Sequence, residues 1–151
     1  MATIVINSNS YVTEAELATY ASDRGITIAT VDTTILLIKA MDFLESRNFI
    51  GVKTDITQVL QWPREVCTGI LYCAIDNTVV PTAIKQAQMI AALIIDGGNE
   101  VQPTVERAVK SERVDVLEVE YMDNAIATIQ HTKLQDILRP YLANTLRAVR
   151  T

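Results

Sequence analysis

The pattern of apolar positions predicts a central helix over residues 81–97. Pro81 suits a first turn, where a missing backbone N–H costs nothing, and Gly97 with Gly98 can supply the left-handed residue that ends a helix. Residues 89–95 are apolar on every face of such a helix. A helix of this kind must be surrounded by other elements, and it is too short to span a membrane, which needs roughly 20 apolar residues.

Two amphipathic helices are predicted before it. Thr13 and Glu16 fit a capping box, which predicts a first helix over about 13–24. A second helix, over about 32–47, carries a wide apolar surface. The polar side of this second helix is formed by Lys39, Asp42, Glu45 and Arg47.

The segment over residues 52–80 is less regular. Residues 55–60 could form one more helical turn, and residues 76–78 read as a turn. Trp62 is the single tryptophan, and its place before a proline favours an extended backbone. We expect its ring to fill the core beneath a loop. A short helix is expected from residue 133 until Pro140 interrupts it.

Apolar residues alternate along residues 106–121, which predicts two strands with a turn near Asp115. Charged residues occupy both faces of this predicted ribbon, and an isolated two-stranded ribbon is only marginally stable in water. We therefore expect the ribbon to need a partner, either its own helices or another chain. The elements together predict a mainly α fold, a small helical bundle around the central helix with a β-ribbon or long loop.

Length and charge limit the function. The 151 residues suit a single domain, 1–151, with an extended N-terminal arm over 1–12 and an extended C-terminal tail over 140–151. A net charge of −5 and an aromatic content of 5% argue against a protein whose main function is to bind nucleic acid. No signal peptide pattern begins the chain, and Cys67 and Cys73 are expected to be reduced thiols, so we expect a cytoplasmic protein without a membrane.

Catalytic patterns do not stand out. His131 is the single histidine and has no nucleophile motif around it, so acyl transfer has no visible base. Glu118 and Glu120 would share one face of a strand and could hold a divalent ion, but a solvated face is the simpler interpretation. We therefore predict no enzyme: no catalytic residues, no cofactor and no metal.

The order of six short motifs resembles a known family. They are Tyr-Val-Thr-Glu-Ala-Glu-Leu from Tyr11, Leu-Leu-Ile-Lys-Ala-Met-Asp from Leu36, Gln-Trp-Pro-Arg from Gln61, Val-Pro-Thr-Ala-Ile-Lys-Gln from Val80, Glu-Arg-Val-Asp-Val-Leu-Glu from Glu112 and Leu-Arg-Pro-Tyr-Leu from Leu138. This order resembles the head–tail connector, adaptor or head-completion proteins of tailed bacteriophages, some of which carry the label DnaT-like single-stranded-DNA-binding. The chain departs from that family at Asp115, where related sequences usually turn with a glycine.

The resemblance implies a structural virion protein in the neck, assembled in the host bacterial cytoplasm. About a dozen copies would form a closed ring with head-to-tail contacts, a homo-oligomer that continues the DNA channel of the portal protein. The ring would join the portal to a downstream tail or head-closure protein. Its acidic wall would let DNA pass without specific binding. The alternative is the binding module of the family label, which coats single-stranded DNA.

Candidate residues follow from this resemblance together with the charge pattern. Contacts between subunits are assigned to Arg107, Lys110, Glu112, Arg113, Glu118 and Glu120. Docking onto the portal is assigned to the basic, leucine-containing end of the chain, at Tyr141, Leu142, Leu146, Arg147 and Arg150.

Overall fold

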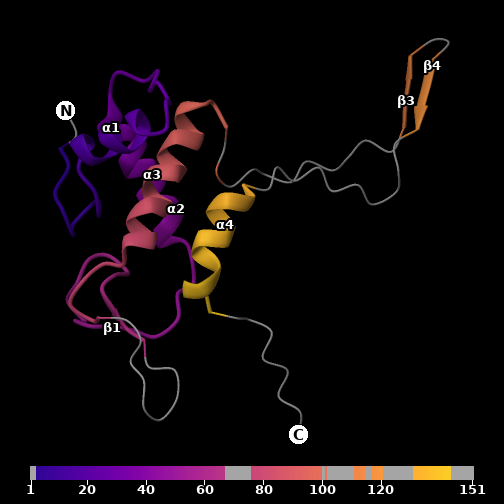
Figure 1. Ribbon diagram of the computed structural model, residues 1–151. Helices are drawn as coiled ribbons and strands as arrows, with labels where there is room; N and C mark the ends of the chain where they lie inside the picture. The colour runs from indigo at the N-terminus through magenta and orange to yellow at the C-terminus, as the bar shows by residue number, and fades with distance from the viewer. Residues whose placement is uncertain are drawn as a thin grey trace, which may run out of the picture.

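A computed structural model of the protein is mainly helical (Figure 1). It describes residues 3–66, 76–99, 101 and 131–143, and the backbone of two further strands at 111–114 and 117–120. The helices are α1 (Glu14–Ser22), α2 (Thr33–Glu45), α3 (Thr82–Asp96) and α4 (Thr132–Leu138), followed by a 3₁₀ turn, η1 (Arg139–Tyr141). The strands are β1 (Val52–Lys53), β2 (Arg64–Glu65), β3 (Ser111–Val114) and β4 (Leu117–Glu120). Within the described ranges, no helix has the length and apolar character to cross a membrane.

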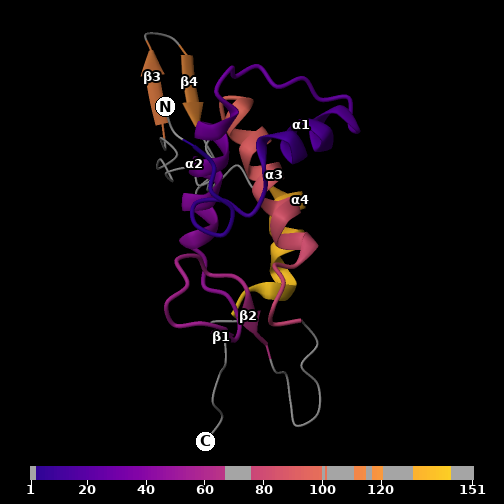
Figure 2. The same cartoon turned by 90° about the vertical axis from the view of Figure 1, so that its left-hand side faces the viewer.

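α3 lies at the centre of the helices, as the sequence predicts. It packs against α1, α2 and α4, and the last two run alongside it in both views (Figures 1 and 2). Its buried side includes Ile84, Ala87 and Ala91, and Gly98 ends the helix region with φ at +77°. The last apolar turn, at Leu93 and beyond, is half-buried instead of enclosed, because the neighbouring helices leave part of it uncovered.

The predicted capping box of the first helix is confirmed. The backbone N–H of Glu16 donates to Thr13 Oγ1 at 3.2 Å, and the backbone N–H of Thr13 donates to Glu16 Oε2 at 2.6 Å. Glu14 then ties α1 to the start of α2, since its carboxylate accepts the hydroxyls of Thr33 at 2.9 Å and Thr34 at 2.6 Å. The first two helices are therefore joined by side chains at their N-terminal turns.

The end of the predicted N-terminal arm enters the body. Ser10, Tyr11 and Val12 are buried, and Tyr11 reaches the central helix, where its backbone N–H donates to Gln88 Oε1 at 3.0 Å. Gln88 Nε2 donates in turn to Ser10 Oγ at 2.8 Å and to the carbonyl of Leu37 at 3.1 Å. One buried amide thus joins the N-terminal segment, α2 and α3.

Residues 55–60, where one more helical turn was possible, contain a hydrogen-bonded turn but no helix, and the strands β1 and β2 flank this segment. Val52 pairs with Glu65 and Lys53 with Arg64 in antiparallel register. Asp55 Oδ1 accepts the backbone N–H of Thr57 at 2.8 Å. Gln58 Nε2 donates to the backbone carbonyls of Leu60 and Pro63, both at 2.9 Å. These side chains satisfy the backbone locally and so compete with helix formation.

Trp62 fills the core beneath this loop, as predicted. It is 1% exposed, and its ring meets those of Phe49 and Tyr141 edge-on, at centroid distances of 5.7 and 5.6 Å. The turn predicted at residues 76–78 is also present, with Asp76 Oδ1 accepting the backbone N–H of Thr78 at 2.8 Å.

The predicted ribbon is confirmed in backbone. β3 and β4 pair antiparallel with Val114 opposite Leu117, and the turn predicted near Asp115 lies outside the described residues. Neither strand contacts another helix or strand among the elements that the structure describes. The remainder of the range 106–121, both cysteines and residues 144–151 of the predicted extended tail lie outside the described residues.

Candidate nucleic-acid interface

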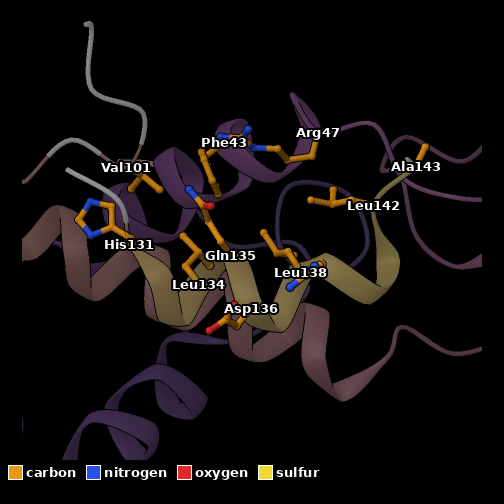
Figure 3. Close-up of a pocket in the computed structure, with 11 residues that line it drawn as sticks. Phe43, Arg47, Val101, His131, Leu134, Gln135, Asp136, Leu138, Leu142 and Ala143 are labelled. Atoms are coloured by element: carbon orange, nitrogen blue, oxygen red, sulfur yellow. The ribbon is translucent and has the colours of Figure 1, made fainter. Parts of the chain in front are cut away.

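A groove of about 650 Å³ lies between the C-terminal end of α2 and α4 (Figure 3). One wall comes from α2 and the residues just after it, and the other from α4, η1 and the residues that follow. The lining residues are Phe43, Arg47, Val101, His131, Leu134, Gln135, Asp136, Leu138, Arg139, Leu142 and Ala143.

Helical spacing explains how these side chains come together. Phe43 and Arg47 are four residues apart at the end of α2, so they lie one above the other on the same side. Gln135 in α4 and Arg139 at the start of η1 are also four residues apart. Leu134, which is buried, lies beside Gln135 on the α4 wall (Figure 3).

Arg47 has an unusual environment. Its guanidinium carbon lies 4.2 Å from the centre of the Phe43 ring, which is a cation–π geometry. Its Nε is buried and has no hydrogen-bond acceptor among the residues that the structure describes. Burial lowers the pKa of the Arg47 guanidinium, but an arginine starts so high that it stays charged.

Arg24 provides a comparison within the same chain. It also follows an aromatic residue by four positions, and its guanidinium carbon lies 3.5 Å from the centre of the Tyr20 ring. Unlike Arg47 Nε, its Nη1 donates to a backbone carbonyl, that of Tyr20, at 3.1 Å. Arg24 and Arg47 thus both lie over an aromatic ring four residues earlier in the chain. Of these two arginines, Arg47 is the one with a buried N–H donor that has no acceptor among the described residues.

The charge of the groove differs in sign from that of the chain. Arg47 and Arg139 line it against a single lining carboxylate, Asp136, whereas the whole chain carries −5. The groove therefore presents cationic, aromatic and aliphatic surface together. Within the described ranges, no group of three or more His, Cys, Asp or Glu side chains is arranged to hold a metal ion.

The far end of the groove is held by the loop that contains β1 and β2. The backbone N–H of Ile50 donates to the carbonyl of Tyr141 at 2.9 Å, and that of Ala143 donates to the carbonyl of Asn48 at 2.9 Å. Phe49 and Leu142 form a β-bridge between these two bonds. The segment after α4 is therefore fixed along this loop by its backbone.

A buried polar cluster in turn fixes the loop. Arg64 Nε donates to the carbonyl of Ile50 at 2.8 Å, and its Nη2 donates to that of Gly51 at 2.6 Å. Glu45 Oε1 accepts the Tyr11 hydroxyl at 3.0 Å, and this burial raises the pKa of Tyr11 far above its ordinary range. The cluster satisfies its members internally, so we assign it to the stability of the loop.

The predicted docking residues Tyr141 and Leu142 do not project from the protein. Both are half-buried against its own body, Tyr141 on Trp62 and Leu142 beside Phe49. Of the predicted site residues whose side chains the structure describes, Tyr141 and Leu142, only Leu142 lines the groove. Leu146, Arg147 and Arg150 lie outside the described residues.

The predicted subunit contacts fall on or near the ribbon. Glu112, Arg113, Glu118 and Glu120 are described by backbone alone, with Arg113 opposite Glu118 in the register, and Arg107 and Lys110 lie outside the described residues. Arg47, predicted to lie on the polar side of a helix, lines the groove, which the sequence did not predict. The four-residue spacing of Phe43 and Arg47 was a signal for it, but the facing wall is distant in sequence.

Comparison with known proteins identifies the family. A family model described as "Putative DnaT-like ssDNA binding protein" matches residues 2–151. The chain belongs to this family. No curated protein and no solved structure matches the chain significantly.

The family match corrects the assignment to phage head–tail connectors, which is wrong. The predictions that depended on this assignment are also wrong. They are the ring of about a dozen copies, the portal and head-closure partners, the role in the neck, and the passage of DNA without specific binding. Much of the quoted motifs consists of helix-capping residues, prolines at helix N-termini and turn residues. Such residues report local backbone chemistry that many helical proteins share, so their order carried less information than it suggested.

Proposed function

We propose that the protein binds single-stranded DNA and acts by binding, without a reaction of its own. The observation that carries this proposal is the family match, which runs over nearly the whole chain. It supports the alternative that the resemblance implied, a single-stranded-DNA-binding module, over the structural adaptor.

The groove between α2 and α4 supplies chemistry that suits this function. Proteins that bind single strands combine cationic side chains for the phosphates with aromatic or guanidinium planes for the bases. Arg47, Arg139 and Phe43 provide groups of both kinds. The overall charge of −5 opposes binding at long range, so we expect modest affinity that depends on local contacts and falls with added salt.

Fluorescence anisotropy of a labelled oligothymidine of about 20 nucleotides would test the proposal. The expected result is a rise in anisotropy at low salt, with an affinity that decreases with log salt at a slope of about −0.7 for each phosphate contact. A duplex of the same length serves as the comparison and should bind more weakly. The absence of any change at low salt, at high protein concentration, would rule out single-stranded-DNA binding.

A further inference from the structure

Arg47 stands out because its place in the groove leaves a donor unpaired. Buried N–H groups in native proteins are nearly always hydrogen-bonded, so a buried donor without an acceptor calls for an explanation. The Nε of Arg47 has no acceptor in the described part of the chain. Arg47 is half-buried and lines the groove, and guanidinium groups bind phosphates through parallel hydrogen bonds, so a phosphate in the groove would lie beside this cation.

The Phe43 ring holds the guanidinium in place before a ligand arrives. The guanidinium carbon of Arg47 lies 4.2 Å from the ring centre, so contact with the ring restricts where the charged group can lie. A planar fork that is already oriented loses less conformational entropy on binding than a free side chain. The same plane can stack on a base of a single strand.

The rest of the groove fits a nucleotide chain better than a free anion. Arg139 gives a second cation, while the half-buried Val101 and Leu142 give apolar surface that suits the faces of sugars and bases. A volume of about 650 Å³ lies in the range of small-ligand sites, roughly 300–1,000 Å³, which corresponds to one or two nucleotides at a time. A duplex keeps its base faces stacked inside and cannot present them to such a groove.

We infer that the α2–α4 groove is the single-strand binding site, with Arg47 as its phosphate anchor and Arg139 holding a second phosphate. This inference rests on the proposed single-stranded-DNA binding and specifies where and through which groups it occurs. Lysine at position 47 would keep the charge but lose the planar fork, so it should restore binding only in part.

Anisotropy titrations of the labelled oligothymidine with Arg47→Gln, Arg47→Lys and Arg139→Gln test the inference. Arg24→Gln is the matched control, because Arg24 also stacks on an aromatic ring four residues earlier but lies outside the groove. We expect Arg47→Gln to weaken binding about tenfold, Arg47→Lys by less, and each neutral variant in the groove to reduce the salt slope by about 0.7. Arg24→Gln should bind like the unchanged protein.

The outcomes separate the two proposals. If the unchanged protein binds and the three groove variants match Arg24→Gln, the groove is not the site, while single-stranded-DNA binding stands. If Arg139→Gln alone weakens binding, Arg47 is not the anchor. If the unchanged protein fails to bind, both proposals fall. Thermal unfolding of each variant shows that it is folded, and the exposed Arg139 and the conservative Arg47→Lys keep the test valid if Arg47→Gln is unstable.

Discussion

The side-chain carbonyl of Gln88 accepts the backbone N–H of Tyr11 at 3.0 Å, across 77 positions of sequence. Gln88 is fully buried within the central helix, and its amide nitrogen donates to Ser10 and Leu37. A polar residue in a helical core is stable there only when its hydrogen bonds are made. This amide therefore selects one placement of the N-terminal segment against α2 and α3.

Gln88→Leu should destabilise the protein by about 1–3 kcal/mol, because it leaves the buried N–H of Tyr11 without its acceptor. Urea unfolding followed by the fluorescence of Trp62 measures the change, since this single tryptophan is 1% exposed. Gln86→Leu, at a half-buried position of the same helix, is the control and should change stability by less than about 0.5 kcal/mol. Equal effects of the two substitutions would contradict the role of Gln88.

Gly51→Ala should be the most damaging of the glycine substitutions. Gly51 has a φ of +76°, and a Cβ there would overlap the backbone carbonyl of Glu65 across the β1–β2 pair. Gly25 and Gly98 also have positive φ, at +64° and +77°, but no atom lies within 4 Å of an added Cβ. We expect about 1–2 kcal/mol for each of these two and more than about 3 kcal/mol for Gly51→Ala, measured by thermal unfolding.

Stability should fall in acid through Asp96. Hydrogen bonds from Thr30, and from the backbone N–H of Ala29 at 2.9 Å, lower the pKa of this carboxyl below its ordinary value. A lowered pKa in the folded state stabilises the protein above the pKa of the unfolded chain, and the contribution is lost as the pH falls through the folded value. Urea unfolding between about pH 6 and pH 2 measures this loss.

Asp96→Asn is the variant that isolates this effect. It should be less stable than the unchanged protein near neutral pH and should lose less stability on acidification. Asp42→Asn, at an exposed position of α2, is the matched control. Parallel pH curves for Asp96→Asn and the unchanged protein would show that the carboxylate does not hold the loop before α2.

Phe43→Leu should weaken DNA binding without removing a charge. The substitution removes the ring under the Arg47 guanidinium, and a cation–π contact at a partly exposed site corresponds to about two- to fivefold in affinity. Anisotropy titrations of Phe43→Leu, Arg47→Gln and the double variant form a thermodynamic cycle. If Phe43 acts by orienting Arg47, the double variant should bind no more weakly than Arg47→Gln, and fully additive losses would contradict this coupling.

The sequence by itself determined the elements whose signals are local. Thr13 and Glu16 are three positions apart, so their capping box and the first helix follow from neighbouring residues. Pro81 before α3 and the left-handed Gly98 after it mark the central helix in the same way, and alternation alone indicated the paired strands β3 and β4.

Only the tertiary structure decided the contacts that join distant segments. The groove brings Phe43 and Arg47 opposite residues 131–143, and no local periodicity encodes which helix faces another. The β1–β2 pair and the burial of Tyr141 on Trp62 likewise depend on partners far along the chain. Helix propensity and capping act over a few neighbouring residues. The choice among possible packings of the helices depends instead on burial and on the hydrogen bonding of buried polar groups such as Gln88, and both are defined only once the helices pack together.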